Sequence, residues 1–399
     1  MMSHNQQKQT TIVDESISQL HEKEFFSINT PLKNRVKFLE SLPYTTYPFN
    51  KRSWGHNWHG LCSYQSRLKA SLAHFLVLTF SKPKDRVLDP FSGVGTVPFE
   101  SCMNGRIGYG VDINPVAYNT TLAKVTAPRK EAVTSVLKDL EKYLSKYHSE
   151  EQVDDYTRRF YHADTLSEIL SAKDFFKKKL QKNKDGAVSF LLASMLHILH
   201  GNRPYALSRR SHNLTPLAPS GPFIYKSVID RLTNKINLAY KNNDISKRFE
   251  QGESQMGSVF DLPHKDDFFD VILTSPPFWG STRFYANNRL RLWFCGWDHH
   301  TQGKKGRSQF LEECQKQGLS IYENVFSELF RVLKDDGTCV MHLGVTKDMD
   351  IGKKIKIYAK NVGFEFTKLV YEDTSKIEHH GMSDQGVTHM HQFLILKKN

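Results

Sequence analysis

A short strand, a glycine-containing loop and a helix are expected in succession over residues 85–103, and this unit most restricts the possible folds. The apolar pair Val87 and Leu88 begins the strand, and Gly93 and Gly95 allow a close backbone approach or a positive φ. Strand, glycine loop and helix in this order form the nucleotide-binding unit of α/β sheets. We therefore expect an α/β fold, although such loops also join strands to helices in proteins that bind no nucleotide.

An acidic residue after the next strand strengthens this interpretation. Residues 106–115 are expected to form that strand and its end, where Asp112 and Asn114 follow the apolar residues. Asp112 lies about 20 residues beyond the glycine loop, the distance at which an acid accepts hydrogen bonds from ribose hydroxyls. The alternative is a helix N-cap, because Asp and Asn both cap helices well. We favour the ribose role.

A second strand end carries an unusual turn. The apolar run over residues 268–273 is followed by Thr-Ser-Pro-Pro-Phe-Trp over residues 274–279. The two prolines fix φ and remove two N–H donors, so the turn is stiff and presents carbonyl groups. A hydroxyl, a fixed carbonyl and an aromatic ring at one strand end suit a planar base with an exocyclic amine. The alternative is a strand terminator with no chemical function.

The remaining chain divides into a sheet region and a long helical segment. Further strands are expected at residues 257–263, 338–343, 365–371 and 392–396, and helices at residues 131–144, 166–180, 187–200 and 225–240. Parallel strands normally reconnect through one helix, so residues 128–255 are predicted to be a large, mainly helical insertion. Residues 1–50 are predicted to be an N-terminal arm, and residues 51–127 and 256–399 the catalytic domain.

The composition restricts the partners and the compartment. The chain has 55 Lys and Arg against 42 Asp and Glu, a net charge of +13, which favours a polyanionic partner. Its five cysteines are scattered without a CxxC pair, so we expect neither a metal site nor a disulfide framework. The polar N-terminus and the absence of a long apolar run predict no secretory signal and no membrane association. We expect a cytoplasmic protein associated with the nucleoid.

Two basic stretches are candidate nucleic-acid contacts. Arg203, Arg209 and Arg210 lie in a non-helical segment of the insertion, and Arg283, Tyr285 and Arg289 lie in a stretch where arginines alternate with aromatic residues. Arginine suits phosphates and guanine edges, and aromatic rings suit an unstacked base. The alternatives are a solvated loop and an amphipathic helix. The aromatic segment over residues 51–59 is equally well interpreted as a nucleic-acid or cofactor edge or as a packed lid.

The glycine-loop motif Asp-Pro-Phe-Ser-Gly-Val-Gly-Thr (residues 89–96), followed by Thr-Ser-Pro-Pro-Phe (residues 274–278), resembles the amino-methylating DNA methyltransferases. The resemblance covers residues 53–127 and 256–399. It implies a Rossmann-like class I methyltransferase fold, S-adenosyl-L-methionine as cofactor and double-stranded DNA as partner. Serine before the two prolines is more typical of N4-cytosine enzymes, whereas N6-adenine enzymes more often carry Asp or Asn there.

The resemblance also implies roles for individual residues. The catalytic turn comprises Ser275, Pro276, Pro277 and Phe278. The implied cofactor residues are Tyr64, Ser66, Asp89, Pro90, Phe91, Ser92, Gly93, Gly95, Thr96, Asp112, Asn114, Ser258, Asp261 and Thr274. The family usually has a Gly-Asp pair facing the adenine, where this chain has Gly257 and Ser258, so Asp261 and Asp164 are further candidates for that contact.

Other functions remain open at this point. An RNA amino-methyltransferase shares the fold and a similar loop, and a nucleic-acid-binding protein with a decayed cofactor site would keep the same pattern. A dinucleotide oxidoreductase is disfavoured because the loop lacks the third glycine of GxGxxG. A restriction endonuclease or another defence protein is a possible partner of a site-specific DNA methyltransferase.

Overall fold

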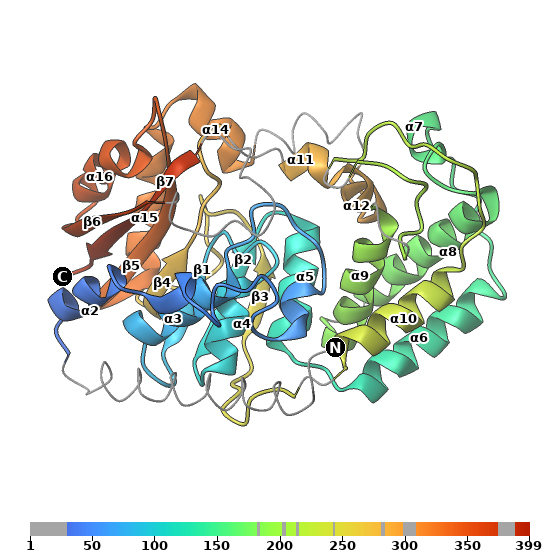
Figure 1. Ribbon diagram of the computed structural model, residues 1–399, viewed down its shortest axis with the longest axis horizontal. Helices are drawn as coiled ribbons and strands as arrows, with labels where there is room; N and C mark the ends of the chain where they lie inside the picture. The colour runs from blue at the N-terminus through green and yellow to red at the C-terminus, as the bar shows by residue number, and fades with distance from the viewer. Residues whose placement is uncertain are drawn as a thin grey trace.

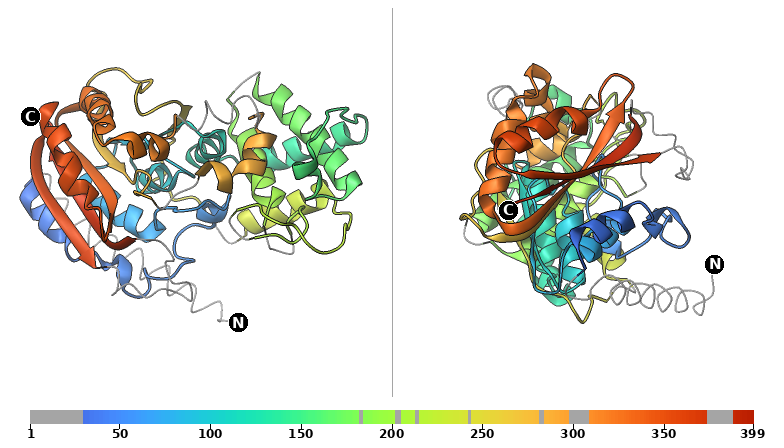
Figure 2. Two further views of the ribbon diagram at one scale, coloured as in Figure 1. Left: turned by 90° about the horizontal axis from the view of Figure 1, so that it is seen from above. Right: turned by 90° about the vertical axis from the view of Figure 1, so that its left-hand side faces the viewer.

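The computed structural model describes residues 30–181, 184–201, 205–212, 215–241, 244–280, 284–297, 309–373 and 388–399. The predicted α/β fold is confirmed. Figure 1 shows a twisted sheet covered by helices at one end of the molecule and a group of helices at the other, and the view from above in Figure 2 shows the same division.

The sheet has seven strands in the order β3-β2-β1-β4-β5-β7-β6. The strands are β1 (Arg86–Asp89), β2 (Ile107–Asp112), β3 (Glu253–Met256), β4 (Phe269–Thr274), β5 (Leu333–Thr346), β6 (Glu365–Asp373) and β7 (Thr388–Lys397). Neighbouring strands pair in parallel from β3 to β5, whereas β7 is antiparallel to both β5 and β6. The order reverses between β1 and β4, and ligands of open α/β sheets bind at such a switch point.

Alternate residues of the central strands face two different hydrophobic cores, as the strand period of two requires. Val87 and Val271 belong to the core shared with helices α2 and α3, whereas Leu88 and Ile272 belong to the core shared with α15 and α16. The helices that flank the sheet are α2 (Leu32–Leu39), α3 (Ala70–Phe80), α4 (Thr96–Met103), α5 (Pro115–Val125), α14 (Leu311–Gln317), α15 (Ile321–Val332) and α16 (Ile351–Asn361).

The segment before α3 is part of the folded domain, which corrects the predicted N-terminal arm over its described part. Val36 and Leu39 of α2, together with Tyr44 and Phe49, are buried against α3 and one sheet face. The 3-10 helices η1 (Pro43–Thr45) and η2 (Asn57–Gly60) complete this segment. Trp58 is 1% exposed, so the interpretation of residues 51–59 as packed structure holds for this ring.

The predicted helical insertion consists of α6 (Lys130–Leu144), α7 (Asp155–Arg158), α8 (Ala163–Leu180), α9 (Gly186–Leu199) and α10 (Val228–Ala239). Helix α9 is apolar on all sides and is buried from Ala187 to its end, so it forms the centre of the bundle. The Asp185 carboxylate caps its start by accepting from the Ala187 and Val188 amides. Helix α9 also packs on α5, which joins the bundle to the sheet domain.

Two boundaries differ from the expected ones. Strand β3 ends at Met256, before the predicted strand, because residues 257–263 form a turn region that contains an isolated bridge between Ser258 and Asp261. The sheet therefore resumes inside the predicted insertion, because β3 begins at Glu253. After β4, helices α11 (Phe284–Asn287) and α12 (Arg289–Phe294) return to the bundle, and Leu290 joins its hydrophobic core.

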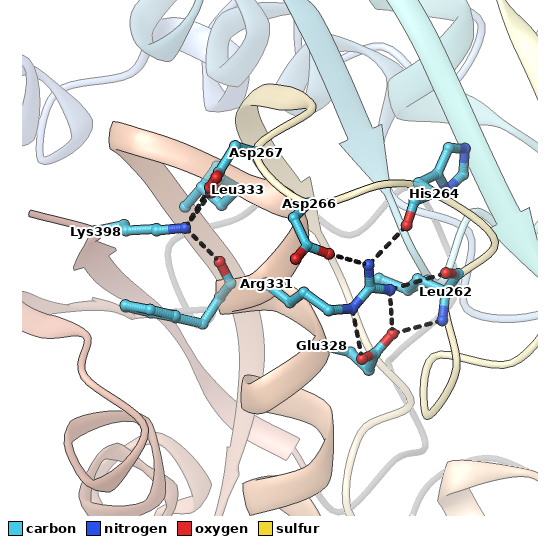
Figure 3. A network of polar contacts seen from close by, with 9 residues as sticks. Leu262, His264, Asp266, Asp267, Glu328, Arg331, Leu333 and Lys398 are labelled. Atoms are coloured by element: carbon cyan, nitrogen blue, oxygen red, sulfur yellow. Dashed lines mark hydrogen bonds and ion pairs between the residues drawn. The ribbon is translucent and has the colours of Figure 1, made fainter.

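A polar network fixes the loop that leads into β4 (Figure 3). The Arg331 guanidinium on α15 donates to the Leu262 and His264 carbonyls and pairs with Glu328 and Asp266. The Glu328 carboxylate also accepts from the Leu262 amide at 2.7 Å. Because β4 begins directly after this loop, the network holds the start of the strand that leads into the Ser-Pro-Pro turn.

We expect Arg331→Ala to lower the free energy of unfolding by about 1.5–3 kcal/mol, because several charge-assisted hydrogen bonds are lost at a partly buried site. Urea unfolding followed by circular dichroism measures the change. Lys316→Ala is the control, since Lys316 pairs with Glu313 on an exposed surface and should contribute little. Equal unfolding midpoints for the two variants would contradict the structural role of Arg331.

Candidate active site

A pocket lies at the carboxyl ends of β1, β2 and β4, where the strand order reverses. The lining residues are Tyr64, Pro90, Phe91, Gly93, Asp112, Ile113, Gly257, Ser258, Val259, Ser275, Pro277, Phe284, Gln309, Phe310 and Leu311. The pocket therefore collects the glycine loop, the acid after β2 and the Ser-Pro-Pro turn, three features that the sequence places far apart.

The glycine loop is fastened to the acid that follows β2. The Gly93 amide donates to Asp112 Oδ2 at 2.9 Å, and the Asn114 amide donates to Oδ1 at 2.9 Å. Gly93 has a φ of +49°, which L side chains rarely adopt. Each oxygen of Asp112 keeps a second lone pair, so the carboxylate can still accept from a hydroxyl in the pocket.

Asn114, rather than Asp112, caps helix α5. The Asn114 side chain accepts from the Val116 amide at 2.9 Å and donates to the Tyr64 hydroxyl at 3.0 Å. The helix-cap alternative for Asp112 is therefore wrong. Burial raises the pKa of Asp112 to about 6, so the carboxylate is ionised at neutral pH and protonates in mildly acidic solution.

A buried contact joins the ends of β1 and β4. The Thr274 hydroxyl donates to Asp89 Oδ1 at 2.6 Å, and the Phe91 amide donates to the same oxygen at 3.1 Å. Burial raises the pKa of Asp89 to about 7, and both hydrogen bonds oppose this rise. Asp89 and Thr274 do not line the pocket, and their contact joins the glycine loop after β1 to the Ser-Pro-Pro turn after β4.

The Ser-Pro-Pro turn, predicted to be catalytic, reaches the same pocket through Ser275 and Pro277. Ser275 Oγ lies 3.3 Å from His342 Nδ1 on β5, a contact that restricts the hydroxyl. The Phe278 ring packs beside His342, with ring centroids 5.5 Å apart, and against the backbone of Gly344. A Cβ added at Gly344 would lie 2.6 Å from Phe278 Cδ2, so only glycine allows this ring position.

Of the residues predicted to contact the cofactor adenine, one lines the pocket and the others are exposed outside it. Ser258 lines the pocket together with Gly257 and Val259, whereas Asp261 is exposed in the turn that follows. Asp164 is also exposed and belongs to the first turn of α8, next to His162. Among the candidates for this contact, only Ser258 faces the pocket.

Several other predicted cofactor residues do not line the pocket. Ser92 and Thr96 are buried, and Gly95 begins α4 with a φ of +70°. A Cβ at Gly95 would lie 2.6 Å from Thr121 Oγ1, so this glycine allows α4 and α5 to pack closely. Ser66 is exposed with a φ of +55° and does not line the pocket.

The structure adds pocket residues that the sequence did not indicate. Phe284 stacks on Tyr64 with ring centroids 5.3 Å apart, and its amide donates to Glu312 Oε1 at 3.1 Å. Burial raises the pKa of Glu312 to about 7. Phe310 and Leu311 complete this wall. No spacing motif marks these residues, because Phe284 begins α11, whereas Phe310 and Leu311 lie at the start of α14.

The residues predicted to contact nucleic acid differ in their exposure and in the contacts that they make. Arg210 is exposed, whereas the Arg209 guanidinium bonds to the Gly221 and Arg159 carbonyls. Arg289 lies over the Tyr156 ring at 3.6 Å, and Tyr285 is buried. The other two candidates, Arg203 and Arg283, lie outside the described residues.

The sheet order with its antiparallel β7, and the glycine loop and acid at its switch point, define the S-adenosylmethionine-dependent class I methyltransferase fold. A family model described as "RMKL-like, methyltransferase domain" matches residues 58–185, from η2 into the helical insertion. A comparison with curated proteins finds no match. No helix of the described residues combines the length and the apolar character needed to cross a membrane.

Solved structures of methyltransferases also resemble the chain. A TehB-like S-adenosylmethionine-dependent methyltransferase from Corynebacterium glutamicum has 10% identity and a TM-score of 0.34, with 86% of this chain and 95% of that chain covered. TrmN from Thermus thermophilus has 11% identity and a TM-score of 0.32, and the match covers 86% of this chain and 53% of that chain.

A third structure, also from Thermus thermophilus, is the S-adenosyl-L-methionine complex of a "putative DNA modification methylase". It has 16% identity and a TM-score of 0.21, and the match covers 36% of this chain and 51% of that chain. All three TM-scores are low, so the fold class rests on the sheet order and the pocket of this chain. Fold, pocket and family match together support an S-adenosylmethionine-dependent methyltransferase.

Proposed function

We propose that the protein is a site-specific DNA methyltransferase that transfers a methyl group from S-adenosylmethionine to the exocyclic N4 of cytosine in flipped-out DNA. The proposal rests on the pocket that Ser275 and Pro277 share with Gly93 and Asp112. A cofactor held by the glycine loop and the acid would thus lie next to the turn that receives the base.

The cofactor side of the pocket suits a nucleoside with an amino-acid tail. Asp112 offers acceptors for the two ribose hydroxyls, and Gly257 and Ser258 form the wall expected to face the adenine. Pro90, Phe91 and Gly93 bring backbone close to the methionine part. When bound, S-adenosylmethionine supplies an electrophilic methyl group.

The catalytic turn would make the base amine nucleophilic. The N4 lone pair of cytosine is delocalised into the ring, so the amine reacts poorly in its planar form. Its two N–H groups would donate to the Ser275 hydroxyl and to the Pro276 carbonyl, which pulls the nitrogen toward tetrahedral geometry and frees the lone pair. Phe278 would stack on the base. Alignment of the two bound reactants would supply most of the rate enhancement.

The helical insertion is the proposed target-recognition region. A groove there is lined by Arg158, Arg159 and Phe223, together with the acidic residues Glu151 and Asp155. Arginines suit phosphates and guanine, and carboxylates accept from the cytosine amine in the major groove. The loop that contributes Phe223 also exposes Leu217, Ile224 and Tyr225, whose half-exposed side chains suit contact with a partner.

Sequencing with modified-base detection tests this proposal. DNA from cells that express the wild-type protein should contain N4-methylcytosine in one short sequence context, and DNA from cells with the Ser275→Ala variant should not. A parallel assay supplies the purified protein with radiolabelled S-adenosylmethionine and DNA, tRNA or rRNA. Methylation at N6 of adenine would change the assigned base from cytosine to adenine. Methylation of RNA alone would change the assigned substrate from DNA to RNA. No methyl transfer to DNA, tRNA or rRNA would overturn the proposal.

A further inference from the structure

We propose that His342, Glu372 and His391 form a binding site for a divalent first-row transition-metal ion such as Zn²⁺, directly behind the catalytic turn. Each side chain offers one ligand atom, and the three ligand atoms lie within 4.8 Å of one another. Two imidazoles and one carboxylate are a common ligand set for such ions. The site goes beyond the proposed methyl transfer, which uses none of these three side chains as a metal ligand.

The sheet brings these residues together from three strands. His342 lies on β5, Glu372 on β6 and His391 on β7. Glu372 and His391 are direct partners across the β6–β7 pair. The rings of His342 and His391 have centroids 4.7 Å apart. Because all three positions are fixed by strand register, the ligand set is held by regular backbone rather than by a loop.

Unsatisfied buried atoms are the second observation. His342 Nε2, Glu372 Oε2 and His391 Nδ1 are each buried, and none has a hydrogen-bond partner among the described residues. Buried polar atoms nearly always have a partner, so three such atoms in one place indicate a missing ligand.

The distance between two of the ligand atoms suits one ion. Two bonds of about 2.1 Å at a tetrahedral angle place their ligand atoms about 3.4 Å apart. His391 Nδ1 and Glu372 Oε2 are 3.6 Å apart. His342 is 4% exposed, and burial together with the nearby His391 holds its pKa well below the usual range.

The site contacts the catalytic turn through His342 and His391. His342 Nδ1 faces Ser275 Oγ at 3.3 Å, so Nε2 is the ring nitrogen left for an ion. An ion on Nε2 places the ring proton on Nδ1, which then donates to the Ser275 hydroxyl. His391 also packs on the Phe278 ring, with centroids 5.7 Å apart. A bound ion would thus fix the positions of both Ser275 and Phe278.

The competing explanation is a simple ion pair between a protonated His391 and Glu372. The ion pair accounts for the 3.6 Å contact between His391 and Glu372, but it leaves His342 Nε2 without a partner among the residues described. The two explanations differ in a measurable way, because an ion pair takes up no metal.

Metal binding to the full-length protein without an affinity tag tests the site. After treatment with a chelator and its removal, we expect calorimetry to show uptake of one equivalent of Zn²⁺. Co²⁺ should give the visible d–d absorption of a site with nitrogen and oxygen ligands. Glu372→Gln and His391→Ala should weaken Zn²⁺ binding at least about 10-fold, because each removes one ligand.

His148→Ala and Glu141→Gln are the matched controls, since both remove an exposed group of the same kind outside the site. They should bind Zn²⁺ as the wild type does. Thermal unfolding followed by circular dichroism separates ligand loss from misfolding, because Zn²⁺ should raise the Tm of the wild type but not that of folded Glu372→Gln or His391→Ala. No stoichiometric uptake by the wild type, or equal uptake by wild type and His391→Ala, would overturn the proposal.

Discussion

Replacing Ser275 by alanine is expected to lower kcat for methyl transfer by about 100-fold or more, the usual loss when one preorganised hydrogen-bonding group is removed from a reacting centre. The Kd for S-adenosylmethionine should stay within about twofold, because Asp112 and Gly93 remain in place. In the proposed mechanism, the Ser275 hydroxyl accepts a hydrogen bond from the base amine, whose geometry changes during the reaction. Its loss therefore affects turnover more than binding of either reactant.

Single-turnover methylation of a saturating DNA substrate measures this effect, and calorimetry with S-adenosylmethionine alone measures the cofactor affinity. Ser145→Ala is the control, because the Ser145 hydroxyl bonds to the local Lys142 carbonyl on an exposed helix end. Wild-type turnover in Ser275→Ala would show that the turn after β4 only terminates a strand. A large loss of cofactor affinity in this variant would show that Ser275 belongs to the cofactor site.

Local patterns in the sequence were sufficient for most of the fold. Val87 and Leu88 begin β1, and the apolar run before Thr274 forms β4, since each strand is buried on both faces. β3 was placed too late because its residues, Glu253–Met256, have no apolar alternation and the strand lies at the sheet edge. The packing of α2 was missed because only Val36 and Leu39 are buried in this otherwise polar helix.

The candidate site was predictable only where a motif is continuous in the chain. Gly93, Asp112 and Ser275 each follow a strand, and parallel strands bring their carboxyl ends to one edge. Phe284 and Glu312 approach the pocket from loops and helices whose course depends on tertiary packing. The scattered cysteines led to the prediction of no metal site. His342, Glu372 and His391 share no spacing motif, because strand register alone makes them neighbours.

Asp112→Ala is expected to raise the Kd for S-adenosylmethionine by about 10- to 100-fold, since two ribose hydroxyls lose a charged acceptor. The Gly93 and Asn114 amides also lose their shared partner, which loosens the loop that holds the cofactor. Titration calorimetry on both proteins at pH 7.5, a value about one and a half units above the pKa of Asp112, measures the difference with the wild-type carboxylate ionised.

The pH dependence gives an independent test of the same carboxylate. Burial raises the pKa of Asp112 to about 6, and protonation removes the charge that accepts from the ribose. Wild-type affinity should therefore be constant at higher pH and fall as the pH is lowered through about 6, whereas Asp112→Ala should lack this decrease. Asp348→Ala, which removes an exposed carboxylate, should keep the wild-type profile. A decrease of equal size in Asp112→Ala would assign the titration to another group and remove Asp112 from the ribose site.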